Sequence, residues 1–584
     1  MTKKQTLPWD FLQEFRGKDF KGEWPTFAEL LNIQSKRYPE RPFFVDFSGP
    51  SDSKRIFTYS DVYSKVQNIA KWLCENGLKK GEHVIVTGKN SPEWATVYLS
   101  VLYANGIIIP LDNGLHENEI INLVSKSDPK FIFCDDEKKQ TFNSNFKSIK
   151  TLSINNPESK DYVFNLMPKN KETFTSDANE NDTAAILFTS GTTGNAKGVM
   201  LSHKNLISDG YIAQQNFNHY STDVFYALLP IHHAYTMQAA FINPFETGAS
   251  IVFGKSMAVS KLMKELKEGQ ITVMLGVPLL YNKLLSGINK GIKSKGPVIS
   301  ILLQLLSNIS FLIKKITGKN IGKKLFKQVL QQANIYTLRV AICGGGPLAT
   351  SVFKQYNAMG IDFIQGYGLT ETSPIIALNP VDKFKIQSVG KDFYPYEEVK
   401  IINKNPLLSK KGFGIGEIAI KGPMVMQGYY NMPEETKAMF TDDGFLKTGD
   451  LGWMDKDRYI MLCGRAKNVI VTSGGKNVYP EEIEDSFQLY FDSIQQIVVQ
   501  SYIDNEETKS EAIEALIYPS DELYKRLKIE RNNFTNDEVL DEIQEIVNKV
   551  NKSFQPYSQI SRIKILDKPL EMTTSQKIKR NYNK

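Results

Sequence analysis

The first half of the chain alternates between helix-length amphipathic segments and short apolar runs, and this alternation restricts the fold more than any other feature. Segments 58–76 and 92–105 have helical character. Strands alternating with helices at this spacing favour an α/β fold with doubly wound, mostly parallel sheets covered by helices on both faces. The runs that read as buried strands are 83–87, 107–110, 131–134, 185–188, 250–253 and 338–342. Arg339 lies in the last run and must find a polar partner or an exposed end.

The pattern of predicted secondary structure changes after about residue 380. Short strands at 399–402, 416–421 and 459–462 are separated by Gly, Pro and Asp turns, which predicts a small β-rich subdomain at about 380–463. A last α/β stretch holds strands at 494–501 and 512–518 and an amphipathic helix at 537–553. We therefore predict an N-terminal domain over 1–466 and a C-terminal domain over 467–584.

Composition is that of a globular protein, with 41% hydrophobic and 23% charged residues. The four cysteines form no Cys-x-x-Cys pair, which fits a reducing compartment better than a disulfide framework or a zinc ribbon. The first ten residues hold two lysines and no apolar core of a secretory signal. We expect a cytoplasmic protein, with a peripheral place at the inner face of a membrane as an option.

Positive charge is concentrated in one stretch. Residues 269–361 contain twelve Lys and Arg and no Asp or Glu, so their net charge is +12. The net charge of the whole chain is +7, so the remaining residues carry −5. This distribution excludes a uniformly basic nucleic-acid binder. Only Phe311 and Phe326 are aromatic within 287–332, so no base-stacking platform is present there either.

A glycine-rich loop follows the run at 185–188. Segment 189–198 reads Thr-Ser-Gly-Thr-Thr-Gly-Asn-Ala-Lys-Gly, and its amides, hydroxyls and lysine suit phosphate oxygens. It is not a Walker A loop, because Ala196 and Gly198 stand where that pattern needs Gly and Ser or Thr.

This loop resembles the signature of the adenylate-forming (AMP-binding) superfamily, which includes acyl-CoA synthetases, luciferases and the adenylation domains of peptide synthetases. That signature commonly has Pro where this chain has Ala196. The resemblance implies an N-terminal AMP-binding domain, a mobile C-terminal domain, and Mg²⁺ bound with Thr193 as one ligand. It also implies that the β- and γ-phosphates of ATP are held by Thr189, Ser190, Gly191, Thr192, Thr193, Gly194 and Lys197.

Further motifs of the superfamily follow in chain order. His233, in Leu-Pro-Ile-His-His-Ala-Tyr, aligns with the histidine that faces the acid, although a packing role stays open. The resemblance places adenine against Gly344, Gly345, Gly346 and Pro347, and assigns nucleotide binding also to Gln365, Gly366, Tyr367, Gly368 and Thr370. Tyr367 suits stacking on adenine. Glu371 is a carboxylate suited to binding Mg²⁺. Its neighbour Thr370 can form a hydrogen bond with the α-phosphate.

The last motifs lie near and beyond the predicted domain boundary. Asp450 and Arg465 correspond to the residues that bind ribose, and Lys467 to the hinge. Gly474, Gly475 and Lys476 correspond to the loop that approaches the thiol acceptor. Lys577 aligns with the catalytic lysine that also contacts the nucleotide, although Gln576 replaces the usual Gly before it. Arg458 stands where relatives have Gly, so Asp457 or Arg458 should adopt a less favoured backbone conformation.

These motifs imply an enzyme that uses ATP and Mg²⁺ to convert a carboxylic acid to an acyl adenylate and then transfers the acyl group to a thiol. The extra length at 284–332 resembles the insertion of long-chain fatty acyl-CoA synthetases, so we favour a long-chain fatty acid as substrate and CoA as acceptor. Three alternatives stay open: an acyl-acyl-carrier-protein synthetase, a ligase for aromatic or other acids, and a non-catalytic acyl-adenylate or lipid-binding relative.

The insertion has a mixed apolar and basic character. Apolar residues recur at helical spacing between Val298 and Ile313, with lysines on both sides. This apolar run is interrupted by polar residues and reads as too short for a membrane span. Segment 283–327 is predicted either to pack on its own protein with solvated lysines or to contact a partner. That partner would be an anionic membrane surface or the phosphates of CoA.

Overall fold

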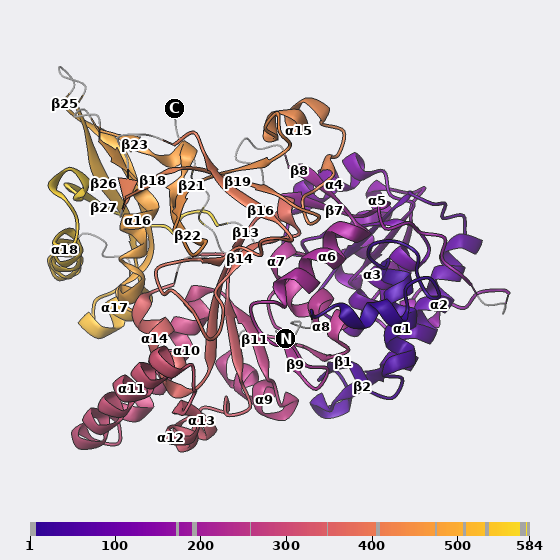
Figure 1. The fold of residues 1–584 in the computed structure, drawn as a ribbon, viewed down its shortest axis with the longest axis horizontal. Coiled ribbons are helices and arrows are strands. Elements are labelled where there is room, and N and C mark those ends of the chain that lie inside the picture. Colours follow the sequence, from indigo (N-terminus) through magenta and orange to yellow (C-terminus); the bar gives the residue numbers. More distant parts are fainter. Residues whose placement is uncertain are drawn as a thin grey trace, which may run out of the picture.

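The computed structural model describes residues 7–170, 174–189, 196–256, 258–346, 348–404, 409–410, 412–472, 476–505, 510–531, 536–572, 578 and 580. The sequence prediction of sheets covered by helices is confirmed (Figure 1). Helices before residue 270 are α1 (Phe27–Arg37), α2 (Tyr59–Glu75), α3 (Pro92–Tyr103), α4 (Glu117–Ser127), α5 (Asp136–Asn145), α6 (His203–Ala213), α7 (Ala234–Met237), α8 (Asn243–Thr247) and α9 (Val259–Gly269). Those after it are α10 (Pro278–Lys293), α11 (Pro297–Thr317), α12 (Gly322–Leu325), α13 (Lys327–Gln332), α14 (Thr350–Met359) and α15 (Pro433–Met439).

A seven-stranded sheet fills the N-terminal part. Its strands β7, β4, β3, β5 and β6 run parallel, whereas β8 pairs antiparallel with both β7 and β20. The order is β20 (Gly428–Tyr429), β8 (Lys197–Ser202), β7 (Thr183–Thr189), β4 (Ile107–Leu111), β3 (His83–Thr87), β5 (Phe131–Cys134) and β6 (Lys150–Ser153). Every residue of α3 is buried, which agrees with its mostly apolar sequence. The glycine-rich loop connects the antiparallel strands β7 and β8.

The second sheet has thirteen strands and a parallel centre. The strands β1, β10, β9, β11, β12 and β13 run parallel, and β2 and the strands from β14 to β16 are antiparallel additions. In order they are β16 (Glu398–Ile402), β19 (Gly416–Lys421), β21 (Leu446–Met454), β22 (Tyr459–Arg465), β15 (Gly390–Lys391), β14 (Ile375–Leu378), β13 (Asp362–Gly368), β12 (Val340–Cys343), β11 (Val273–Gly276), β9 (Val224–Ala227), β10 (Ser250–Phe253), β1 (Pro42–Asp46) and β2 (Arg55–Thr58). The β-rich part is thus continuous with this sheet through β14 and β15.

The structure confirms the expectations for Arg339 and Arg458. Arg339 precedes β12, and its Nε donates to Asp223 Oδ1 over 2.7 Å, which supplies the predicted polar partner. Arg458 has a positive φ of 67°, in the left-handed region that favours glycine. Its guanidinium donates to both carboxylate oxygens of Asp392, at 2.9 Å each from Nε, and this ion pair compensates for the backbone conformation.

The C-terminal part forms a separate three-stranded sheet of β25 (Ile494–Asn505), β26 (Ser510–Pro519) and β27 (Arg562–Ile565). Helices α16 (Pro480–Asp485), α17 (Asp521–Leu527) and α18 (Asp537–Asn551) accompany it, and a hydrophobic core of its own includes Val499, Ile517 and Ile543. A short hairpin of β23 (Ile470–Val471) and β24 (Asn477–Val478) precedes it. An independent core of this kind is what allows a segment to move as a unit.

Candidate active site

Four parallel strands of the second sheet end at the same edge. Ligands of open α/β sheets bind outside the carboxyl ends of parallel strands, so the loops after β9, β11, β12 and β13 should form one site. The loops after β9, β11 and β12 carry His233, Val277 and Gly344, and Tyr367 lies at the end of β13. All four residues line one cavity of about 3470 Å³. The fold therefore brings together motifs that lie far apart in the chain.

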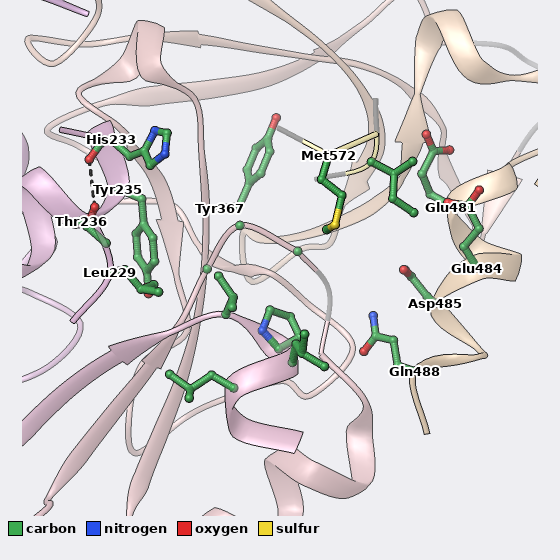
Figure 2. A pocket seen from close by; sticks show the side chains of 18 of the residues that line it. Leu229, His233, Tyr235, Thr236, Tyr367, Glu481, Glu484, Asp485, Gln488 and Met572 are labelled. Atoms are coloured by element: carbon green, nitrogen blue, oxygen red, sulfur yellow. Dashed lines mark hydrogen bonds between the residues drawn. The ribbon is translucent and has the colours of Figure 1, made fainter. Parts of the chain in front are cut away.

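The cavity lies between the N-terminal and C-terminal parts. Figure 2 shows His233, Tyr235 and Tyr367 on one side and Glu481, Glu484 and Gln488, from α16 and the 3-10 turn Gln488–Tyr490, on the other. Many of the sequence-predicted residues line it, namely Thr189, Lys197, His233, Gly344, Gly345, Gly346, Gly366, Tyr367, Gly368, Thr370, Glu371, Arg465 and Lys467. Buried Gln365 lies within β13 and does not line it. Ser190, Gly191, Thr192, Thr193, Gly194, Pro347, Gly474, Gly475 and Lys577 lie outside the described residues.

Three predicted nucleotide-binding residues form one polar group, in which Tyr367 and Arg465 line the cavity and Asp450 is buried beside them. The Tyr367 hydroxyl donates to Asp450 Oδ2 over 2.7 Å, and Arg465 Nε lies 2.8 Å from Asp450 Oδ1. Asp450 and Arg465 are cross-strand partners on β21 and β22, which fixes their geometry. Burial and the nearby Asp450 carboxylate raise the pKa of Tyr367 well above its usual value, so the phenol stays protonated. An aromatic face beside an oriented carboxylate suits a base and a ribose.

At two positions after β12, steric constraints explain why the residue is glycine. A Cβ on Gly344 would lie 2.9 Å from the ring of Tyr235, whose hydroxyl donates to the Ile342 carbonyl over 3.0 Å. Gly345 has a positive φ of 80°, a conformation that side chains rarely adopt. The backbone after β12 is therefore bare, and a flat ring can approach it closely.

Glu371 is positioned by a residue that the sequence motifs do not reveal. Its Oε1 accepts a hydrogen bond from the Tyr429 hydroxyl over 2.8 Å, and Lys197 Nζ lies 4.6 Å from the centre of the Tyr429 ring. Tyr429 thus joins the end of the glycine-rich loop to the predicted Mg²⁺ ligand. A single half-buried carboxylate at the cavity wall fits a Mg²⁺ ion that takes its other ligands from phosphates and water.

A second group near His233 was also missed by sequence reasoning. His232 Nε2 lies 3.4 Å from Asp112 Oδ2, and the rings of His232 and His233 are 4.1 Å apart. One ligand atom from each of the three side chains lies within 4.8 Å of the others, a spacing compatible with a bound cation. The Leu-Asp dipeptide at the end of β4 was the only signal for Asp112.

The hinge and acceptor residues differ in their positions. Lys467 lies in a 3-10 turn, Ala466–Asn468, directly after β22, and burial together with the charges of Arg465 and Arg580 lowers its pKa. Lys476 is exposed in the β23–β24 hairpin and does not line the cavity. Its predicted role at the thiol acceptor therefore requires a different orientation of the C-terminal part.

Arg580 anchors the C-terminal motif. It forms an ion pair with Glu484, lies 3.8 Å from Glu481, and donates from Nη1 to the Val499 carbonyl over 3.4 Å. Burial raises the pKa of Glu484 to about 7, whereas Arg580 acts in the opposite direction and favours the ionised form. Met572 and Ile578 form an isolated antiparallel bridge, and both line the cavity with Arg580. The segment that carries Lys577 therefore begins and ends at the cavity wall.

We expect Arg580→Gln to slow adenylation about tenfold, because loss of the ion pair frees the segment that positions Lys577. Thioester formation from supplied acyl adenylate should change less than about threefold, since Lys577 is predicted to act only in adenylation. Single-turnover assays of each half-reaction provide the measurement. The matched control is Arg526→Gln, which removes another C-terminal ion pair, with Glu542, that does not line this cavity. Equal slowing of both half-reactions would contradict the positioning role.

Comparison with known proteins agrees with this site. A family model described as AMP-binding enzyme matches residues 31–430, and one described as AMP-binding enzyme C-terminal domain matches residues 467–583. A long-chain-fatty-acid–[acyl-carrier-protein] ligase of Arabidopsis thaliana is 27% identical over 82% of this chain and 75% of its own. A long-chain-fatty-acid–CoA ligase of Bacillus subtilis is 25% identical over 84% of this chain and 85% of its own.

The fold has solved counterparts as well. The crystal structure of ATP-bound MatB from Rhodopseudomonas palustris matches with a TM-score of 0.73 at 24% identity, and the match covers 94% of this chain and 97% of that one. Since the first family model alone spans more than half of the chain, this protein belongs to the AMP-binding enzyme family.

Proposed function

We propose that this protein is an ATP-dependent ligase that activates a long-chain fatty acid as its acyl adenylate and transfers the acyl group to the thiol of CoA. In the first step a carboxylate oxygen of the acid bonds to the α-phosphorus of ATP, the bond to the β-phosphate oxygen breaks, and pyrophosphate leaves. In the second step the thiol sulfur bonds to the acyl carbon, its proton is lost to solvent, and AMP leaves.

The observed site residues support the first step. Tyr367, Asp450 and Arg465 suit the nucleoside, and Lys197 lies where it can contact the phosphates. Thr370 offers a hydroxyl to the α-phosphate, where charge develops. A Mg²⁺ ion bound by Glu371 would supply further charge neutralisation. Thr193 and Lys577 are proposed for the phosphate and metal contacts on the family resemblance.

One observation carries the choice of a long-chain acid. The cavity wall includes Leu280, Leu284, Ile288 and Ile292, which recur every fourth residue on one face of α10. From the rise of an α-helix this apolar stripe is about 18 Å long, far longer than a short polar acid needs. Val329 and Ala333, in and next to α13, extend the same wall. A wall of this kind favours an alkyl chain, because each buried methylene contributes about 0.8 kcal/mol.

ATP–pyrophosphate exchange with a panel of acids tests the proposal. We expect exchange with palmitate or oleate to exceed that with octanoate by at least about tenfold, because the longer chains bury more methylenes. Butyrate, coumarate and malonate should be weaker still. Highest exchange with coumarate or malonate would overturn the long-chain assignment, and no exchange with any acid would overturn the ligase assignment. Products formed with CoA and with holo-acyl carrier protein then identify the acceptor, and transfer to the carrier alone would replace CoA.

A further inference from the structure

Helix α11 exposes a continuous apolar face. Seven of its apolar residues each have more than half of their surface exposed: Val298, Ile301, Leu302, Leu305, Ile309, Leu312 and Ile316. Apart from the adjacent pair Ile301 and Leu302, they are spaced three or four residues apart, which places them on one stripe along the helix. Figure 1 shows α11 projecting at the lower edge of the molecule. Soluble proteins rarely leave a contiguous apolar patch of this length exposed unless something binds it.

The opposite face of α11 is fastened to α14 and the start of β13. Ser310 Oγ donates to the Ala358 carbonyl over 2.7 Å, and Lys314 Nζ lies 2.6 Å from Asp362 Oδ1. Lys314 is buried, and desolvation lowers its pKa despite the Asp362 carboxylate. At 21 residues α11 is longer than the apolar run indicated, and by length and composition it could cross a membrane. Because one face stays bound to the protein, we expect the helix to lie along a membrane surface instead.

The charge around α11 is one-sided. Eight exposed lysines lie in and next to the helices from α10 to α13: Lys283, Lys290, Lys293, Lys295, Lys315, Lys319, Lys324 and Lys327. Within the part of the chain that the structure describes, none of them forms an ion pair with a carboxylate. Lys314 and Lys323 differ, since Lys314 is buried and Lys323 Nζ donates to the Leu338 carbonyl over 2.8 Å.

The positive charge around α11 indicates which partner would bind the apolar face. A second copy of the chain would bring the same lysines together, and like charges at an interface are unfavourable. An anionic phospholipid surface offers phosphates to the lysines and an apolar boundary to the stripe, and each lysine near such a surface adds electrostatic attraction. Charge complementarity therefore favours lipid.

The apolar face also begins beside one end of the cavity. Lys295 and Gln332 line the cavity and are hydrogen-bonded to each other, Nζ to Oε1, over 2.7 Å. Helix α11 starts shortly afterwards, at Pro297. A surface that holds α11 would thus lie next to the α10 and α13 wall of the cavity.

We propose that α11 is a docking helix for an anionic phospholipid membrane, with its apolar stripe at the boundary between head groups and acyl chains and the exposed lysines on the head-group phosphates. This interaction goes beyond the proposed catalytic function. It needs neither ATP nor an acid, so its failure and the failure of the ligase assignment are separate results.

Co-sedimentation of the full chain with vesicles tests the proposal. We expect binding to phosphatidylcholine vesicles that contain phosphatidylglycerol, little binding to phosphatidylcholine alone, and weaker binding at high salt. Leu305→Ser/Ile309→Ser should lower the partition coefficient at least about tenfold, because two side chains leave the apolar boundary. The matched control is Gln304→Ser/Asn308→Ser on the same helix, which should change it less than about twofold. Lys315→Gln/Lys319→Gln should lower it about tenfold or more.

Three results would overturn the proposal. They are no binding of the wild-type chain to anionic vesicles, equal binding of the Leu305→Ser/Ile309→Ser variant and its control, and a dimer in sedimentation velocity that only the apolar variant dissociates. The third result would assign the stripe to a second copy of the chain. If the apolar variant does not fold, the lipid-charge and salt dependence of the wild-type chain and of the lysine variant still decide.

Discussion

Lys577→Ala is expected to reduce acid-dependent ATP–pyrophosphate exchange at least about a hundredfold, the scale of losing one charged group that stabilises a transition state. The ammonium would act on oxygens of the α-phosphate, where negative charge builds as pyrophosphate leaves. Thioester formation from supplied acyl adenylate should stay within about threefold of wild type, because the proposed rotation of the C-terminal part about Lys467 would remove Lys577 before that step. The bridge between Met572 and Ile578 at the cavity wall supports this assignment.

The two half-reactions must be measured separately. Exchange reports adenylation, and rapid mixing of purified acyl adenylate with CoA reports transfer. Lys568→Ala is a matched control, since Lys568 is exposed, belongs to the same domain and does not line the cavity. Lys579→Ala tests the neighbouring lysine of the motif. Equal loss of both half-reactions in Lys577→Ala, or a larger exchange defect in Lys579→Ala, would show that the assignment to Lys577 is wrong.

Gly368→Ala is expected to lower the free energy of unfolding of the N-terminal domain by about 3 kcal/mol or more, the upper range of overpacking effects. A Cβ at this position would lie 1.6 Å from the carbonyl oxygen of Pro374, which is backbone and cannot rotate away. That carbonyl accepts hydrogen bonds from Leu369 N at 2.9 Å and Thr372 Oγ1 at 2.7 Å. Moving it would displace the loop that carries Thr370 and Glu371, so adenylation should fall with stability.

Thermal unfolding followed by calorimetry provides the measurement, compared with Gly291→Ala. Gly291 lies in α10, and a Cβ there meets nothing within 4 Å. Replacing a helical glycine with alanine in open space should leave the melting temperature unchanged or raise it, because the helix gains up to about 1 kcal/mol. If Gly368→Ala melts like wild type and retains full exchange, then the loop is not as tightly packed as the Pro374 contact indicates.

Much of the fold was predictable from local patterns. The strands expected at 83–87, 131–134 and 250–253 have these bounds in the structure, because short apolar runs between turn residues leave little choice of register. Two later strands were harder to delimit. In the structure β22, of the β-rich part, extends to Arg465, and β25, of the C-terminal part, extends to Asn505. The added residues, 463–465 and 502–505, mix apolar and polar types, and cross-strand pairing decides where such strands end. The pairing of β14 with β15, which joins this part to the large sheet, has no sequence signal at all.

In the candidate site, too, local motifs were predictable from the sequence and tertiary contacts were not. The motif glycines and Tyr367, Glu371 and Asp450 were named from the chain because each stands within a recognisable run of residues. The partners that orient them come from elsewhere. Tyr429 reaches Glu371 across 58 residues, and Arg580 reaches Glu484 across 96. No periodicity links such positions, since a hydrogen bond between side chains depends only on their distance and direction after folding.

The sequence by itself determined the fold class, the family resemblance and the position of the basic, apolar segment, because periodicity, glycine patterns and charge are local properties of the chain. Only the tertiary structure decided which residues of that segment face solvent. Lys314 is buried against Asp362, whereas Leu305 and Ile309 are exposed, although the pattern favours apolar burial. The physical reason is that an amphipathic stripe identifies a face, whereas the neighbouring helices and their charges determine what that face contacts.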